Sequence, residues 1–182
     1  GKLTPKMARD LSINGKQVFL KIENMSKPVL ALINGYALGG GLELALSCSF
    51  RVASVNSQFG FPETRVGLIP GWGGTVRLPL VVGETKSKQL ITSGDYINAN
   101  EALKIGLVDY VFSLEDFERK TKDIAQRLCD CPQSKRNPLK KPFLSNSFDE
   151  NFDKETEVFA YRFSLAETKS RLAEVLSQRN KK

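Results

Sequence analysis

The stretch from residue 28 to residue 83 constrains the fold more than any other part of the 182-residue chain. It holds ten of the fourteen glycines, no lysine, and only two acidic residues, Glu43 and Glu63. An even scatter of the twenty acidic residues would place about six there. Such an apolar, glycine-rich stretch predicts buried elements joined by tight turns. Charged residues are seldom kept in such surroundings, so the two carboxylates are candidates for function.

The first half of this stretch has the pattern of an α/β unit. Residues 29–33 (VLALI) form an apolar run that ends at Asn-Gly, which predicts a buried strand and a turn. Three glycines then precede good helix formers, so we expect a helix from about Gly40. A second strand is predicted at 50–55. A strand, turn, helix and strand in this order are typical of parallel sheets.

Residues 56–74 predict a loop that shapes the site. The segment NSQFGFPETRVGLIPGWGG contains five glycines and two prolines in nineteen residues, too many for a long regular element.

The rest of the chain is mainly helical in pattern, without an internal repeat. We expect short helices at 75–82 and 84–92, a helix capped by Asn98 or Asn100 that ends near Gly106, a strand at 107–112, a helix from the Ser113 capping box to Pro132, a breaker-rich link to about residue 149, and a final helical stretch.

The absence of histidine narrows the chemistry. The chain itself cannot supply a Ser-His-Asp triad, a Cys-His pair or a His-ligated zinc. Acid–base chemistry must therefore rest on carboxylates, lysines, tyrosines, thiols or a bound cofactor.

Composition also bounds the setting. No apolar run approaches the roughly 18 residues of a membrane span, and the start GKLTPKMARD lacks the apolar part of a signal peptide. The three cysteines are an odd number, and Cys129 lies two residues from Cys131, which disfavours a disulfide framework. We expect a soluble protein in a reducing compartment, the cytoplasm or an organelle matrix. The net charge of +7 suits either nucleic acid or a small phosphorylated ligand.

Glycines 39–41 at the start of the predicted helix leave first-turn N–H groups open to an anion or a developing oxyanion. A tight turn with close helix packing is the structural alternative. No Lys-Ser/Thr follows the glycines and they do not form G-x-G-x-x-G, so a phosphate loop is disfavoured.

Glu43 lies one turn beyond Gly39 and Gly40 on the same predicted helix face. Its structural alternative is a carboxylate that complements the helix dipole, and that of Glu63 is an ion pair with Arg65 or Arg51. Two carboxylates in a desolvated site can act as general base and general acid, and an adjacent oxyanion site suits chemistry beside a carbonyl.

Two other carboxylate chemistries fit less well. One Trp and four Tyr offer little sugar stacking for a glycosidase, and a carboxylate metal site lacks its usual Asp/Asn cluster.

The segments KPVLALINGYALGGGLELALSC and SQFGFPETRVGLIPGWGGTVRLPLVVG resemble the enoyl-CoA hydratase/isomerase (crotonase) superfamily, and most of all an enoyl-CoA hydratase. The resemblance covers roughly residues 25–182. It implies an α/β crotonase-like (ClpP/crotonase) fold of repeated ββα-type units with C-terminal helices. We expect a crotonase core at 1–112 and a helical, oligomer-forming region at 113–182.

The resemblance also implies the site and the reaction. Gly40 is expected to donate its N–H to a thioester carbonyl, Glu43 to activate a water, Glu63 to manage the α-carbon proton, and Gly71 to position the water. The implied enzyme is a hydro-lyase that converts a 2-trans-enoyl-CoA reversibly to the 3-hydroxyacyl-CoA in fatty-acid β-oxidation or related metabolism. Acyl-CoA is the expected substrate, with no cofactor and no metal.

One departure from the family is visible. Members carry a G-A-D-like loop that supplies a second oxyanion N–H, and nothing of that kind precedes Lys27. We therefore expect the N-terminal third of the fold to be missing from this sequence, which would leave half an oxyanion hole.

Two alternatives stay open within this resemblance. One is an enoyl-CoA isomerase, although family isomerases often keep only the carboxylate at the Glu63 position. The other is an RNA-binding relative, although the basic residues are dispersed and do not form a comb with aromatic side chains. We expect a homotrimer or hexamer and no membrane or nucleic-acid partner.

Overall fold

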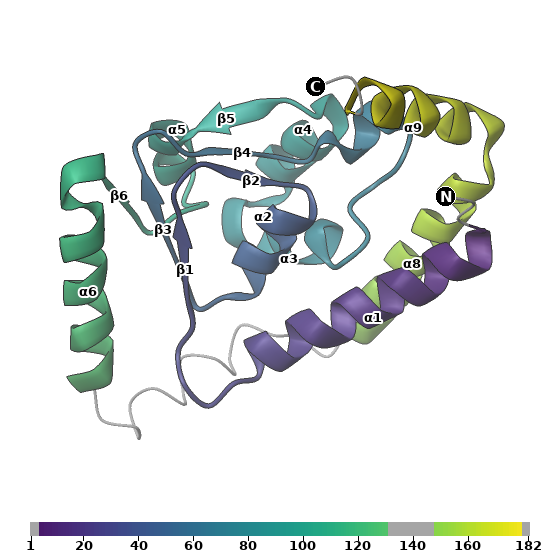
Figure 1. The fold of residues 1–182 in the computed structure, drawn as a ribbon. Helices are drawn as coiled ribbons and strands as arrows, with labels where there is room; N and C mark the ends of the chain where they lie inside the picture. The colour runs from purple at the N-terminus through teal and green to yellow at the C-terminus, as the bar shows by residue number, and fades with distance from the viewer. Residues whose placement is uncertain (1–3, 131–147, 180–182) are drawn as a thin grey trace.

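The computed structural model describes residues 4–130 and 148–179 (Figure 1). The predicted link between Pro132 and residue 149, the basic segment 134–141 and Cys131 lie outside the described residues. In the described residues, two small sheets are surrounded by helices, as the α/β crotonase-like fold predicts.

The first sheet is parallel, in the order β1-β3-β6. It consists of β1 (Leu30–Ile33), β3 (Phe50–Ser54) and β6 (Tyr110–Phe112). The predicted parallel pairing of the first two strands is confirmed. The strand predicted at 107–112 is shorter because residues 107 and 108 enter the core before β6 begins.

The second sheet, in the order β2-β4-β5, was not predicted. Its strands are β2 (Tyr36–Leu38), β4 (Gln58–Gly60) and β5 (Tyr96–Asn98); β2 pairs parallel with β4, and β4 antiparallel with β5. Each strand has three residues, too short for a periodic pattern. The chain runs from β1 into β2 and from β3 into β4, and helices follow both pairs, which gives the expected ββα units.

Most helices lie where the sequence predicts them. They are α2 (Gly40–Ser47), α3 (Gly74–Val82), α4 (Glu84–Ser93), α5 (Ala99–Lys104), α6 (Leu114–Asp130), α8 (Phe148–Ser164) and α9 (Ala166–Arg179). The 3₁₀ helix η1 (Pro62–Val66) lies instead in the segment that was predicted to be a loop. Two predicted caps are confirmed, because Asn98 Oδ1 accepts from Glu101 N at 2.9 Å and Ser113 Oγ from Asp116 N at 3.2 Å.

The main core fills the space between the sheets and helices α2 and α3. Its most deeply buried side chains include Leu42, Phe59, Phe61 and Leu78. Burying a side chain of this size stabilises the fold by about 1.5–3 kcal/mol. The core therefore anchors α2 and the start of α3, the two helices that carry the candidate site.

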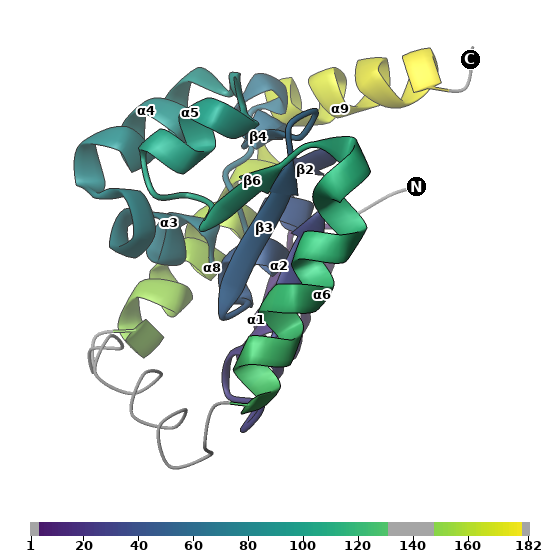
Figure 2. The same cartoon turned by 90° about the vertical axis from the view of Figure 1, so that its left-hand side faces the viewer.

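A helix that was not predicted, α1 (Pro5–Glu23), lies along α8 (Figures 1 and 2). Thr4 caps it by accepting from Met7 N at 3.2 Å, and Pro5 occupies its first turn. On the other side of the molecule, α6 packs against β3 and β6 (Figure 2). Among the described helices, none is both long and apolar enough to cross a bilayer.

Candidate active site

The first turn of α2 presents an open N–H group. Gly39 is its N-cap with a φ of 53°, a conformation that favours glycine, and Gly39 N donates to Gly60 O of β4 at 2.9 Å. Gly40 N has no acceptor in the part of the chain that the structure describes. Because a helix N-terminus carries partial positive charge, this N–H can receive a negatively charged oxygen.

Glu43 points inward from the same turn and is only 2% exposed. Its Oε1 accepts the backbone N–H groups of Trp72 at 2.7 Å and Gly74 at 2.8 Å. The carboxylate is therefore anchored to the start of α3, and does not simply complement the dipole of its own helix.

Glu63 lies in η1, beside the N-cap of α2. A Cβ on Gly39 would lie 2.5 Å from Glu63 Oε1, so a side chain at that position would displace the carboxyl group. Glu63 Oε2 and Thr64 Oγ1 are the buried side-chain oxygens that lack a hydrogen-bond partner in the described residues. An unpartnered buried oxygen is unusual and makes Glu63 ready to bind a ligand or water.

The structure does not contain the ion pair with Arg65 or Arg51 that was the structural alternative for Glu63. Arg65 pairs with Asp95 at 3.2 Å, and Arg51 lies 3.7 Å from Asp109 and donates to Leu107 O. Both arginines proposed as its partners are engaged elsewhere.

The surroundings of both glutamates favour their protonated forms. Burial raises the pKa of Glu43 to about 8, the charge of Glu155 adds to this, and the N–H bonds from Gly74 and Trp72 oppose it. Burial raises the pKa of Glu63 to about 7, again with a contribution from Glu155. Both groups can therefore exchange a proton near neutral pH, as general acid–base chemistry requires.

Gly71 precedes the residue that donates to Glu43. Its carbonyl accepts from Ser12 Oγ of α1 at 2.6 Å, and a Cβ on it would lie 2.6 Å from the Phe159 ring of α8. No acceptor is found for Gly71 N within residues 4–130 and 148–179. The loop that α1 and α8 hold thus places Gly71 directly before Trp72, whose N–H bonds Glu43.

Trp72 was missed by sequence reasoning. A Cβ on Gly15 of α1 or on Gly40 of α2 would overlap its indole ring, so the ring lies between the two helices. Its Nε1 donates to Leu11 O at 3.2 Å, and its ring meets Phe19 edge-on at 5.7 Å. As the only tryptophan, inside a glycine-rich loop, it was a signal that could have been used.

Lys16 and Glu155 were also missed. They form a buried ion pair between α1 and α8, with Nζ to Oε1 at 3.2 Å. The signal was present, because Lys16 follows Ala8 and Ser12 at four-residue spacing and Glu155 lies between Phe152 and Phe159. A charged residue on an apolar helix face indicates a buried partner.

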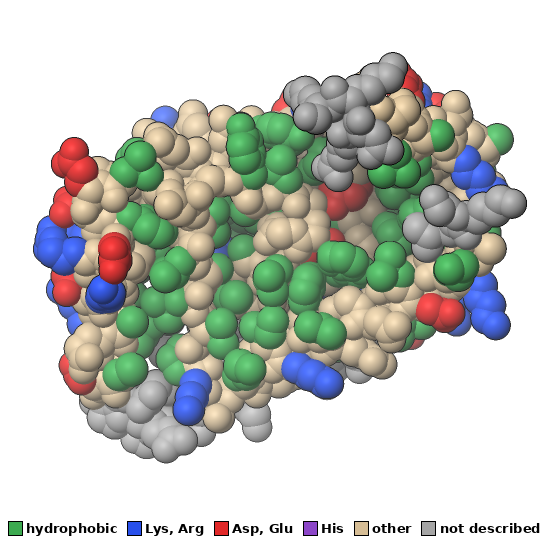
Figure 3. All heavy atoms as spheres, viewed as in Figure 1, with side chains coloured by type: hydrophobic (Ala, Val, Ile, Leu, Met, Phe, Trp, Pro, Cys, Tyr) green, Lys and Arg blue, Asp and Glu red, His purple; other side chains and the backbone are tan. Residues whose placement is uncertain are grey.

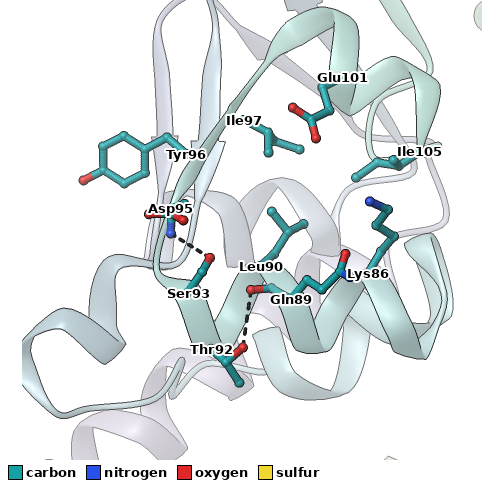
Figure 4. Close-up of a pocket in the computed structure, with 10 residues that line it drawn as sticks. All are labelled: Lys86, Gln89, Leu90, Thr92, Ser93, Asp95, Tyr96, Ile97, Glu101 and Ile105. Carbon is teal, nitrogen blue, oxygen red and sulfur yellow. Dashed lines mark hydrogen bonds between the residues drawn. The ribbon is translucent and has the colours of Figure 1, made fainter.

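Two hollows lie elsewhere. One of about 600 Å³ is formed by α4, β5 and α5, and none of the four predicted site residues lines it (Figure 4). The other, of about 460 Å³, runs along β1 and the outer face of α2. On the face that Figure 3 shows, apolar side chains gather across the middle and basic ones lie toward the margins. The described residues contain no cluster of three or more His, Cys, Asp or Glu placed to hold a metal ion.

Comparison with known proteins identifies the family to which this chain belongs. The family described as enoyl-CoA hydratase/isomerase matches residues 2–180, so the chain belongs to this family. The match begins before residue 25 and therefore includes α1, which extends the resemblance seen in the sequence.

Two individual relatives have names that belong to the same family. The chain is 42% identical over 163 residues to a crotonyl-CoA hydratase of Syntrophomonas wolfei, covering 90% of this chain and 62% of that protein. It is 38% identical over 176 residues to a short-chain-enoyl-CoA hydratase of Clostridium acetobutylicum, covering 94% and 67%. The chain thus spans about two thirds of the length of these relatives.

The fold agrees as well. The crystal structure of an enoyl-CoA hydratase from Mycobacterium avium subsp. paratuberculosis superimposes with a TM-score of 0.86 at 24% identity, covering 94% of this chain and 71% of that one. This similarity concerns the fold alone.

Proposed function

We propose that this chain carries the hydration site of an enoyl-CoA hydratase, which adds water reversibly to a 2-trans-enoyl-CoA to form the 3-hydroxyacyl-CoA. The observation that carries the proposal is the combination of the buried carboxyl group of Glu43, the partly buried carboxyl group of Glu63 and the open N–H of Gly40 at the start of α2. Relatives at 42% and 38% identity are named for this activity, which supports it.

Gly40 is proposed to bind the thioester carbonyl of the substrate. Negative charge grows on this oxygen as water adds to the β-carbon, and an N–H at a helix N-terminus stabilises that charge. Loss of one such donor costs roughly 10²–10³ in kcat in comparable enzymes.

Glu43 is proposed to accept a proton from the water, and Glu63 to donate a proton to the substrate. Glu43 is tethered through Oε1, so Oε2 can accept a proton from a water that Gly71 N helps to orient. The water oxygen bonds to the β-carbon while the carbon–carbon π bond breaks, and Glu63 gives its proton to the α-carbon. The proton on Glu43 then passes to Glu63, which restores the pair.

The assignment of Glu43 as base and Glu63 as acid follows the resemblance to the family. By pKa alone, Glu63 at about 7 would ionise before Glu43 at about 8. The N–H bonds from Trp72 and Gly74 already oppose the rise in the pKa of Glu43, so the order of the two pKa values does not by itself select Glu43 as the base. The charge of Glu63 acts on Glu43, and carboxyl groups that interact titrate as a pair, so one proton shared between them leaves one base and one acid.

The proposed substrate follows from this reaction, and the proposed assembly follows from the resemblance to the family. Acyl-CoA is the substrate, and the chemistry needs no separate cofactor. A homotrimer or hexamer is the proposed assembly, which light scattering of the full-length protein would measure. A nucleic-acid partner is not proposed, since the basic residues are dispersed along the sequence.

The test uses the purified full-length protein with crotonyl-CoA. We expect loss of the enoyl absorbance and a product heavier by one water. Absence of both with crotonyl-CoA and with a longer homologue would overturn the proposal. Conversion of a 3-enoyl-CoA without hydration would instead identify an isomerase, and salt-sensitive retention of RNA would identify the nucleic-acid-binding alternative.

A further inference from the structure

The backbone from Trp72 to Thr75 is shared between two carboxylates. The N–H groups of Trp72 and Gly74 donate to Glu43 Oε1, at 2.7 and 2.8 Å. The N–H groups of Gly73 and Thr75 donate to Glu155, at 2.7 and 3.0 Å. Consecutive N–H groups thus alternate between a carboxylate of α2 and a carboxylate of α8, so a change on one side shifts the donors on the other.

Glu155 has no freedom to move without losing these bonds. Its side chain is 1% exposed; Oε1 receives Gly73 N and Lys16 Nζ, and Oε2 receives both the N–H and the hydroxyl of Thr75. Donors therefore surround both oxygens, which only a carboxylate can accept without conflict. A glutamine would turn its NH₂ group toward a donor.

Lys16 balances the charge of Glu155. Its Nζ bonds Thr156 Oγ1 at 2.5 Å, the Phe152 carbonyl, and Glu155 at 3.2 Å, so its three donors are used. Burial lowers the pKa of Lys16, whereas Glu155, Glu43 and Asp153 raise it. A buried ion pair of this kind is costly to break by removing one partner.

We propose that Glu155, with Lys16 as its counter-charge, is a positioning residue for the hydration: it holds two N–H groups of residues 72–75 so that the other two point at Glu43. The proposal deepens the hydration proposed above and rests on it. Neither residue contacts the reacting atoms in this account. Both act through the donors to Glu43 and through their charge.

The charges of Glu155 and Lys16 shift the pKa of the site in opposite directions. Glu155 raises the pKa of both Glu43 and Glu63, and Lys16 carries the opposite charge close to Glu43. The other charged groups that act on Lys16 are Glu43 of α2 and Asp153 of α8. Arg77 of α3 lies over the Phe152 ring, and its guanidinium bonds Glu23 and Trp72 O.

The test compares Glu155→Gln, Lys16→Met and the double variant in the full-length protein with crotonyl-CoA. For Glu155→Gln we expect kcat to fall by roughly tenfold to a hundredfold with KM nearly unchanged, because the base is misaligned while binding is kept. The limbs of its pH profile move to lower pH. For Lys16→Met they move to higher pH, and in the double variant they return toward the wild type while kcat stays low.

The matched control is the exposed pair on the same two helices. Arg9 and Glu157 are 2.5 Å apart and at least half exposed, so Arg9→Met and Glu157→Gln should leave kcat and both limbs unchanged. Glu155→Asp separates the effect of the charge from the effect on the N–H groups, because it keeps the charge but its shorter side chain no longer reaches them. We expect a low kcat with unmoved limbs.

The outcomes separate this inference from the proposed function. If the wild type does not hydrate crotonyl-CoA, the function fails. If it does, and the limbs of Glu155→Gln and Lys16→Met stay in place while kcat falls only with the folded fraction, the pair is merely structural and the inference is wrong. If Glu155→Gln does not fold, Lys16→Met decides by whether its limbs move, and Glu155→Asp decides by whether kcat per folded enzyme falls.

Discussion

Glu43 and Glu63 set how the reaction depends on pH. The site is active when the pair holds one proton, because one member must accept and the other donate. With pKa values raised to about 7 and about 8, we predict a bell-shaped profile of kcat/KM that falls on either side of this range. Steady-state rates from pH 5 to 10 test this, and a profile that is flat across that interval would contradict it.

The same two residues make stability depend on pH. The pKa of Glu43 is raised from its ordinary 4.5 to about 8, so stability is fully present below 4.5 and is lost as pH rises toward 8. Glu43→Gln should flatten this dependence and stabilise the fold at pH 8 by on the order of a few kcal/mol. Urea unfolding at pH 5 and 8 measures it, with the exposed Glu101→Gln as control. An unchanged slope with pH would show that Glu43 is not held protonated.

Site residues could be predicted from the sequence where the local composition is unusual. Glu43 and Glu63 were predicted as a pair because a long apolar stretch contains no other carboxylate. Glu155 and Lys16 lie among many charged residues, and what distinguishes them is burial, which only the packing of α1 on α8 reveals. Their roles depend on contacts between distant segments, which local pattern does not encode.

At the scale of elements, the indole of Trp72 fixes how close α1 and α2 approach. Gly15 lies inside α1, where a change to alanine ordinarily stabilises a helix by about 1 kcal/mol. Because its Cβ would overlap Trp72, we predict that Gly15→Ala destabilises the fold by about 1–3 kcal/mol and lowers kcat through the shifted ring beside Gly40. Equilibrium unfolding tests this against Asn14→Ala, an exposed neighbour.

A second substitution tests whether the overlap with Trp72 causes this loss of stability. Trp72→Leu should relieve the clash, so Gly15→Ala should cost less in that background. Stabilisation by Gly15→Ala in the wild type would mean that the ring does not pack against α1.

The α-helices that follow residue 39 were predictable from their caps, whereas α1 and the short strands of the second sheet were missed. The helices begin and end within a few residues of the predictions because asparagine, serine and glycine caps mark them. The three-residue strands of the second sheet were missed, since a strand that short shows no alternation. Helix α1 could have been found from Thr4 and Pro5, a cap followed by a first-turn proline.

At the scale of the whole molecule, segments from both ends of the chain hold the site. Phe159 of α8 is buried against Gly71 and meets Phe163 at 5.2 Å. We predict that Phe159→Ala costs about 3–5 kcal/mol and lowers activity with it, because the loop that bears the donors to Glu43 loses its support. Tyr161→Ala, on the exposed face of the same helix, should change stability by less than about 0.5 kcal/mol.

Thermal and urea unfolding of both variants check this prediction. Equal effects of the two substitutions would contradict it. The division of the chain after residue 112 stays a prediction, but Glu155 and Phe159, from beyond that position, contact the loop before α3. The proposed core and the C-terminal helices therefore depend on one another at the site.

The central claim is that two glutamates carry out the hydration, and its most direct test is kcat with crotonyl-CoA for Glu43→Gln and Glu63→Gln in the full-length protein. General acid–base groups contribute about 10²–10⁴ in rate, so each variant should lose at least a hundredfold in kcat, while Glu101→Gln keeps the wild-type rate. Wild-type turnover in Glu43→Gln or in Glu63→Gln would contradict the account.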